Sequence, residues 1–207
     1  MKTILIHPAY FPSIAQMVAV AKADELIFEI HDNYQKQSYR NRTYIAHSNG
    51  RLLLNVPIKH TKDGTRQKTK VVTIENSFPW QTQHWKSLQS AYRTSPFFEF
   101  YEDDIAPIFN TPVKQLMELN FSIFKLLCEL LGLDKTFDTS SEYLIDPPQS
   151  DLRYLVEAKK QKNYLLSSYT QVMEADHGFL PNLSVLDLLF NEGPNALAYL
   201  ESQEIEF

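Results

Sequence analysis

The stretch that decides the fold is TILIHPAYFPSIAQMVAVAKADELIFEI, residues 3–30. Thr3–Ile6 is apolar and β-branched at three of its four positions, a composition typical of a buried strand. Two prolines end that strand, and Ser13 is a favourable N-cap for a helix over residues 14–23. Leu26–Ile30 is a second apolar run. A strand, a helix and a strand within about thirty residues form a βαβ unit, which predicts a Rossmann-like α/β fold.

Apolar periodicity extends the prediction outward from this unit. The runs at Leu52–Ile58 and Val71–Ile74 are expected to add strands to a mostly parallel sheet. Helical spacing of apolar residues predicts helices over about 81–93 and 113–131, and Gly132 is a natural C-terminal stop for the second. The predicted fold class is therefore α/β, with three layers, a mostly parallel sheet and a helical C-terminal part.

Composition limits the classes to which the chain can belong. Its 207 residues are 43% hydrophobic and 22% charged, which fits a single domain over residues 1–207. We place an α/β core at about 1–110 and a helical part at about 111–207. A net charge of −5 argues against a nucleic-acid binder with a broad basic face. No segment is apolar for long enough to span a membrane, and the lone Cys128 fits a cytoplasmic protein.

Polar residues follow both strands of the βαβ unit. His7 and Tyr10 come after the first strand, and His31 and Asp32 come after the second. Because parallel strands end at the same edge of a sheet, these four residues are expected to lie at one edge. Ligands of open α/β sheets bind at that edge, so the placement favours a binding site over a surface loop.

A basic and aromatic cluster, KQSYRNR, occupies residues 36–42. Arg40 and Arg42 carry forked donors that match carboxylates and phosphates, and Lys36 adds a third cation. Tyr39 can stack on a ring of a ligand or donate from its phenol. The same composition also occurs in solvated loops whose stems pack on apolar neighbours, so composition alone gives both interpretations about equal weight.

A second basic stretch, residues 59–70, carries five cations against the single Asp63. It resembles a phosphate patch in composition. Loops of this kind are more often mobile and solvated, so we leave this stretch out of the candidate site.

The predicted helix over 81–93 offers a second group of polar and aromatic side chains. Trp85 and Tyr92 share one face of this helix, and Lys86 lies on another. His84 lies one turn before a core leucine, where a histidine is more often structural than catalytic. Because Trp, Lys and Tyr side chains lie within two turns of it, we give the two roles about equal weight.

Asp187 is a polar residue within an apolar helical stretch at residues 183–193. A carboxylate in that position is either a buried hydrogen-bonding residue or part of a site. We favour the first interpretation, because buried polar groups are usually hydrogen-bonded.

Five motifs occur in a characteristic order along the chain: residues 7–12 (HPAYFP), 36–42 (KQSYRNR), Trp80 with 84–86 (HWK), 91–92 (AY) with 95–98 (SPFF), and 183–193 (LSVLDLLFNEG). Together they resemble the WbqC-like protein family, in the shorter form common in Bacteroidetes. The resemblance runs almost end to end. The first motif departs from the commoner family form, which has Gln where this chain has His7, and this leaves the role of that position in doubt.

The resemblance implies a place in the biosynthesis of O-antigen and other surface polysaccharides. It also implies transfer of an amino-acyl group, such as glycyl, to a sugar. The expected partner is therefore a small-molecule substrate, either a sugar nucleotide or an activated amino acid. No Gly-rich phosphate loop and no metal-ligand spacing occurs, so neither a cofactor nor a metal is expected.

Such a transferase needs a general base, a cationic clamp and aromatic walls. The predicted catalytic residues are His84 and His7. The predicted substrate-binding residues are Tyr10, Lys36, Tyr39, Arg40, Asn41, Arg42, Trp85, Lys86 and Tyr92.

Two alternatives to an enzyme stay open. The same basic and aromatic cluster could hold a sugar nucleotide or another anionic ligand without catalysis. The chain could also be an assembly protein, for example a homodimer, that uses exposed Phe97, Phe98 and Tyr101 as an interface.

Overall fold

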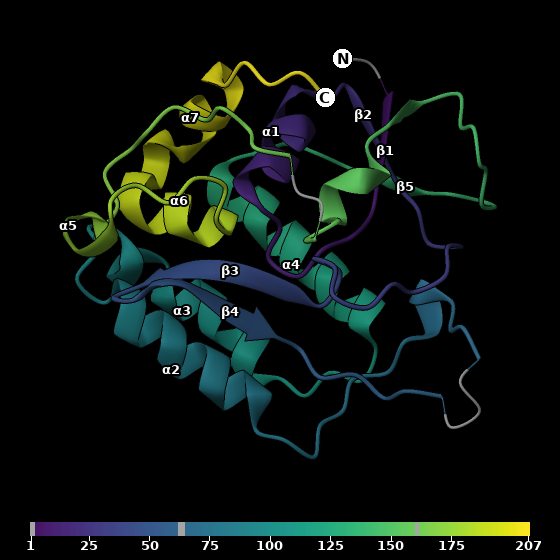
Figure 1. Cartoon of the computed structure of the whole chain (residues 1–207), viewed down its shortest axis with the longest axis horizontal. Helices are drawn as coiled ribbons and strands as arrows, with labels where there is room; N and C mark the ends of the chain where they lie inside the picture. The colour runs from purple at the N-terminus through teal and green to yellow at the C-terminus, as the bar shows by residue number, and fades with distance from the viewer. Residues whose placement is uncertain (1–2, 62–64, 160–161) are drawn as a thin grey trace.

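The molecule contains a four-stranded parallel sheet. The computed structural model describes residues 3–61, 65–159 and 162–207 (Figure 1). The sheet has the strand order β5-β2-β1-β6, and its neighbouring strands pair in parallel. Its strands are β1 (Thr3–Ile6), β2 (Glu25–Phe28), β5 (Asp138–Thr139) and β6 (Ser150–Asp151). The predicted α/β class with a mostly parallel, Rossmann-like sheet is thus confirmed.

The βαβ unit forms where the sequence predicts it. Helix α1 (Ile14–Lys22) connects β1 to β2, and the Ser13 side chain accepts a hydrogen bond from the Gln16 amide at its N-terminus. The first seven residues of α1 are buried, because the helix lies between the sheet and the C-terminal helices. The register pairs Thr3 with Glu25 and Ile6 with Phe28. Residues 7 and 29 therefore leave the sheet at the same edge.

A separate antiparallel hairpin lies beside the parallel sheet. It consists of β3 (Arg42–His47) and β4 (Gly50–Asn55), joined by a two-residue turn. The prediction that residues 52–58 continue the parallel sheet is therefore wrong. Only antiparallel strands can be joined by so short a turn, and Gly50 adopts the positive φ of 99° at its end.

The segment predicted as a strand over residues 71–74 also differs. It forms the 3-10 turn η1 (Thr69–Val71), followed by isolated bridges from Thr73 to Gln115 and from Ile74 to Ile58. No ladder forms, because Gln115 and Ile58 each form only an isolated bridge with this segment.

Three long helices pack against the hairpin and the sheet (Figure 1). They are α2 (Trp80–Tyr92), α3 (Phe98–Asn110) and α4 (Leu116–Leu131). On α4, Phe124 packs edge-on against Phe28 of β2, with ring centroids 5.0 Å apart. Gly132 ends α4 in the left-handed conformation, as predicted. Among the described residues, no helix is long and apolar enough to cross a membrane.

The C-terminal part contributes to the sheet as well as to the helices. Strands β5 and β6 come from this part, and the 3-10 turn η2 (Arg153–Val156) follows β6 directly. The remaining elements are short: α5 (Glu174–His177), α6 (Val185–Glu192), η3 (Gly193–Asn195) and α7 (Ala196–Ser202). The parallel sheet thus takes strands from both parts into which the sequence divides the chain.

The residues proposed as an exposed interface lie mostly inside the molecule. Phe98 and Tyr101 are buried in the core, so their predicted exposure is wrong. Phe97 is partly buried, and its ring lies so close to Gly193 that a Cβ atom there would come within 2.5 Å of it. These aromatic side chains attach α3 to α6 instead.

Asp187 ties the C-terminal helices to the rest of the core. Its carboxylate is fully buried and accepts hydrogen bonds from the Tyr92 hydroxyl at 2.8 Å, the Tyr169 hydroxyl at 2.6 Å and the Gln171 amide at 2.8 Å. The interpretation of Asp187 as a buried hydrogen-bonding residue is confirmed. Its donors come from α2 (Tyr92) and from the loop before α5 (Tyr169 and Gln171).

We predict that Asp187→Asn lowers the free energy of unfolding by about 2 kcal/mol, because an amide nitrogen cannot accept the bonds that the carboxylate oxygen accepts. Urea denaturation followed by circular dichroism measures this change. The matched control is Asp176→Asn, at an exposed position on α5. Equal midpoints for the two variants would contradict the structural role of Asp187.

Candidate functional site

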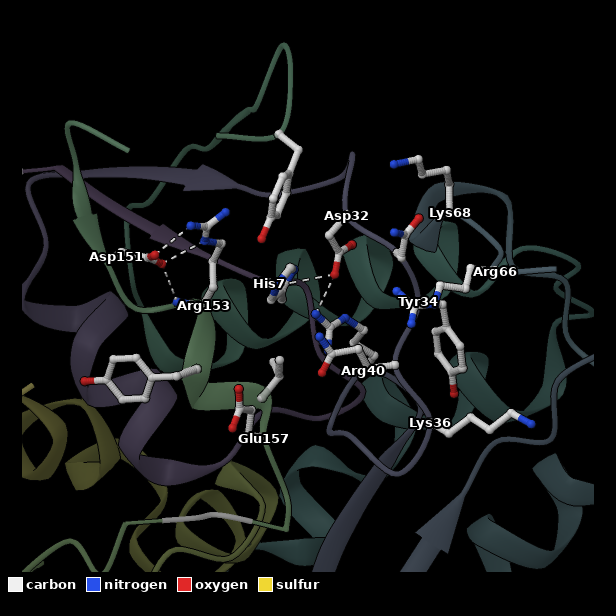
Figure 2. Close-up of a pocket in the computed structure, with 15 residues that line it drawn as sticks. His7, Asp32, Tyr34, Lys36, Arg40, Arg66, Lys68, Asp151, Arg153 and Glu157 are labelled. Carbon is white, nitrogen blue, oxygen red and sulfur yellow. Dashed lines mark hydrogen bonds and ion pairs between the residues drawn. The ribbon is translucent and has the colours of Figure 1, made fainter. Parts of the chain in front are cut away.

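A cleft of about 770 Å³ opens at the carboxyl edge of β1, β2 and β6 (Figure 2). Its wall comes from the segments that follow these strands and from residues 66 and 68 of the second basic stretch. The lining residues are His7, Asp32, Asn33, Tyr34, Gln35, Lys36, Arg40, Arg66, Lys68, Tyr143, Asp151, Arg153, Tyr154, Val156 and Glu157. This is the edge at which open α/β sheets bind ligands.

A buried ion pair lies at the centre of the cleft. Arg40 Nη2 is 2.6 Å from Asp32 Oδ2, and the two side chains are only 2% and 6% exposed. Arg40 Nε and Nη1 and Asp32 Oδ1 are buried and have no hydrogen-bond partner among the described residues. Buried polar atoms are usually paired in proteins, so the missing partners of these atoms, in residues that line the cleft, fit a site that receives a polar group.

His7 lies next to this ion pair. Its Nε2 atom is 3.6 Å from Asp32 Oδ2, and its Nδ1 atom is 3.4 Å from the Glu29 carbonyl oxygen. Both ring nitrogens thus face acceptors, and the neutral tautomer with its proton on Nδ1 keeps Nε2 as an acceptor. Burial, and then the charge of Arg40, hold the pKa of His7 well below its usual value. His7 is therefore neutral at physiological pH.

Hydrogen bonds fix the position of the His7 segment. The Gln16 amide on α1 donates to the His7 carbonyl oxygen at 2.8 Å. Asn120 on α4 donates to the Arg40 carbonyl oxygen at 2.8 Å. Both helices thus hold the backbone of residues that line the cleft, which limits the movement of their side chains.

One wall of the cleft is built around Arg153. Its guanidinium donates to both carboxylate oxygens of Asp151, at 2.8 and 2.6 Å, and to the carbonyl oxygens of Leu144 and Ile145. It also lies 4.9 Å from the centre of the Tyr143 ring. With this many partners, Arg153 supports the wall more than it offers free donors.

The opposite wall is basic. Lys36, Arg66 and Lys68 line it, together with Tyr34. The Tyr34 amide donates to the Gln67 carbonyl oxygen at 2.8 Å, so the segment after β2 pairs with the second basic stretch. This pairing brings cations that are about thirty positions apart in sequence to one side of the cleft.

The cleft differs in charge from the whole chain. Its lining has five cations, Lys36, Arg40, Arg66, Lys68 and Arg153, against three carboxylates, Asp32, Asp151 and Glu157. The excess of two positive charges contrasts with the net charge of −5 of the chain. Anionic ligands are therefore attracted to the cleft more than to the average surface.

The structure brings three of the predicted site residues together in the cleft: His7, Lys36 and Arg40. Tyr10 and His84 lie elsewhere, in the core, where the Tyr10 hydroxyl is 2.8 Å from His84 Nδ1. Burial lowers the pKa of His84 to about 4, against a hydrogen bond to the Asn55 backbone. Both groups thus have structural partners in this arrangement.

The aromatic residues predicted on α2 also pack internally. The Trp85 ring stacks on Phe109 with centroids 5.3 Å apart. The Tyr92 hydroxyl donates to Asp187 and accepts from the Ala46 amide at 3.0 Å. Lys86 is exposed on α2 and is absent from the residues that line the cleft.

The other predicted site residues of the 36–42 cluster are Tyr39, Asn41 and Arg42. Tyr39 is buried, and its ring lies edge-on to Tyr44 with centroids 6.2 Å apart. The Asn41 amide donates to the Val56 carbonyl oxygen at 2.8 Å. Arg42 begins β3. Their predicted roles in binding remain predictions, since none of the three lines the cleft.

Several lining residues were not among those predicted from the sequence. Arg66 and Lys68 lie in the second basic stretch, whose composition was a signal that we set aside. Residues 62–64 of that stretch lie outside the described residues. Asp151 ends β6, a two-residue strand with no apolar signal in the sequence, and Arg153 and Glu157 follow it.

No metal centre is evident in the described part of the chain. Within residues 3–61, 65–159 and 162–207, no three His, Cys, Asp or Glu side chains are arranged to hold a metal ion.

Comparison with known proteins identifies the family of this chain but assigns it no activity. The model of the WbqC-like protein family matches residues 7–168. The uncharacterised protein Rv1507c of Mycobacterium tuberculosis is 26% identical over 226 residues, covering 96% of this chain and 97% of that protein. No solved structure is significantly similar to the chain. The residues that line the cleft, from His7 to Glu157, fall within the matched range.

The burial of His84 predicts that the stability of the fold depends on pH. Its folded-state pKa of about 4 lies below the value near 6.5 of an unfolded histidine, so its contribution to stability is present above pH 6.5. That contribution is lost as the pH falls from 6.5 toward 4, because the unfolded chain then binds the proton more strongly.

Relative to His84→Gln, the wild type should therefore lose roughly 2 to 3 kcal/mol of unfolding free energy between pH 7 and pH 4.5. Urea titrations of both proteins at the two pH values measure it. The other titrating groups, His7 included, occur in both proteins and cancel. A constant difference between the two proteins would show that His84 is not buried as described.

Proposed function

The chain belongs to the WbqC-like protein family, and from this membership and the charge of the cleft we propose that it is a transferase. It transfers an amino-acyl group, such as glycyl, or a related acyl group to a sugar or a sugar nucleotide. Its place is in the biosynthesis of surface polysaccharide or O-antigen in the cytoplasm. We assign the chain to the shorter form of the family common in Bacteroidetes as part of the same proposal.

The observation that carries the proposal is the combination of a cationic cleft with a neutral buried histidine. Activated acyl donors and sugar nucleotides both carry phosphates, and guanidinium and ammonium groups bind phosphates. Arg40, Lys36 and Arg66, which line the cleft, supply the donors. Paired carboxylates in the wall leave this positive charge only partly neutralised.

His7 is suited to the role of general base. In the neutral tautomer with its proton on Nδ1, its Nε2 atom can accept the proton of an acceptor amine or hydroxyl as that group attacks the acyl carbon. The donor's phosphate leaves with the bonding electrons and pairs with the cations. The imidazolium that forms has the Asp32 carboxylate 3.6 Å from Nε2, which stabilises it.

We expect the double variant Lys36→Met/Arg66→Met to weaken binding of UDP and of pyrophosphate by about tenfold, because two exposed phosphate contacts are lost. Isothermal titration calorimetry measures both dissociation constants. The matched control, Arg93→Met/Lys114→Met, removes two exposed cations that do not line the cleft. Equal affinities for the two double variants would place anion binding outside the cleft.

We expect His7→Gln to lower kcat by roughly a factor of 10² to 10⁴ and to leave KM nearly unchanged, because Gln keeps hydrogen bonding but cannot take a proton. Mass spectrometry of sugar nucleotides incubated with glycyl-adenylate, corrected for the reaction without protein, measures turnover. A variant that keeps full turnover would exclude His7 as the base. Ligand binding without turnover by the wild type would favour the non-catalytic alternative.

A further inference from the structure

The two ends of the cleft carry opposite charge. Figure 2 shows Lys36, Arg66 and Lys68 on one side, Asp151 and Glu157 on the other, and His7, Asp32 and Arg40 between them. The basic end has a formal charge of +3, from three cations. The other end has two carboxylates and Arg153, a formal charge of −1. The cleft is thus dipolar, with the histidine between its poles.

Glu157 is the available carboxylate at the acidic end. Asp151 is held by two hydrogen bonds from Arg153, which neutralise its charge. The Glu157 side chain makes no hydrogen bond or ion pair with any residue in the described part of the chain. Its backbone amide donates to the Tyr154 carbonyl oxygen at 2.9 Å, which fixes its position at the end of η2.

Some polar atoms in the lining of the cleft are buried and have no partner. Arg40 is only 2% exposed, and its Nε and Nη1 atoms are unpaired among the described residues. The hydroxyl of Tyr154, which also lines the cleft, is buried and unpaired there. Such atoms also occur outside the cleft, so the property that distinguishes the cleft is the arrangement of its charges.

We propose that the cleft binds a ligand carrying both a phosphate and an ammonium group, with the phosphate at the basic end and the ammonium at Glu157. This inference rests on the proposed function and narrows its substrate. A phosphate-bearing ligand with one ammonium matches the sign of the charge at each end. A ligand with phosphate alone leaves the Glu157 charge without a partner.

Two kinds of molecule have this chemistry. An aminoacyl-adenylate carries the ammonium of its amino acid and a phosphate, and would be the donor. A nucleotide-linked amino sugar carries an amine and a diphosphate, and would be the acceptor. For the acceptor, the ammonium would first lose one proton to water, and the amine would then attack the acyl carbon while His7 takes its second proton and the donor's phosphate leaves with the bonding electrons. The charges of the cleft serve both molecules, and experiment distinguishes them.

The test compares two matched pairs of ligands by isothermal titration calorimetry at mildly acidic pH. The donor pair is 5′-O-(glycylsulfamoyl)adenosine and 5′-O-(acetylsulfamoyl)adenosine, which lacks the ammonium. The acceptor pair is UDP-glucosamine and UDP-glucose. In at least one pair, the ligand with the ammonium should bind the wild type roughly fivefold more tightly, as expected for a partly exposed ion pair.

Glu157→Gln should abolish that preference and leave the affinity for the uncharged member of the pair unchanged. The control is Glu201→Gln, an exposed position on α7 outside the cleft, which should keep the preference. The pair that responds identifies donor or acceptor. Unchanged melting temperatures of both variants show that neither substitution disturbs the fold.

Equal affinities within both pairs, or a preference that survives in Glu157→Gln, would overturn this inference and leave the anion site intact. Absence of binding by all four ligands and by pyrophosphate would overturn the proposed function together with it. The two failures are therefore distinguishable.

Discussion

The buried ion pair between Arg40 and Asp32 is the interaction on which the site depends. It joins the segment after β2 to the segment before β3, and so connects the parallel sheet to the hairpin. Taking both charges out of water is costly, and removing one partner of such a pair typically costs about 3 to 5 kcal/mol. The arrangement persists because other bonds secure both backbones: the Asp32 carbonyl oxygen accepts from the Thr69 amide, and the Arg40 carbonyl oxygen from Asn120.

The ion pair also sets the chemistry of its neighbour. The positive charge of Arg40 and the burial of the ring disfavour the protonated form of His7. The hydrogen bond to the Glu29 carbonyl oxygen acts in the opposite direction and raises the pKa of the ring, but burial and Arg40 outweigh it. A histidine in this environment is available as a proton acceptor. It would return the proton readily, because burial and the Arg40 charge keep its pKa low even with Asp32 3.6 Å from Nε2.

The parts of the site that the sequence predicts are those that depend on local order. His7 and Asp32 directly follow strands whose apolar composition is evident, so their meeting at one edge follows from the parallel register. Strand β6 has two residues and an exposed, polar composition, so the sequence carries no signal that it adds Asp151 and Glu157 to the same edge. On α2 the helical spacing was correct, yet the same face that could have lined a site packs Trp85 on Phe109. Periodicity identifies a face of a helix but not what covers it.

Buried polar groups differ in how they are paired. In the core, both oxygens of Asp187 accept hydrogen bonds, and His84 has Tyr10 and the Asn55 backbone as partners. In the cleft, Asp32 and Arg40 keep unpaired atoms at similar burial. Nine further unpaired buried atoms of the described residues belong to side chains that do not line the cleft, so missing partners alone do not mark a site. What distinguishes Asp32 and Arg40 is that they combine this burial with a place in the lining of a cationic cleft, where a polar ligand can reach them.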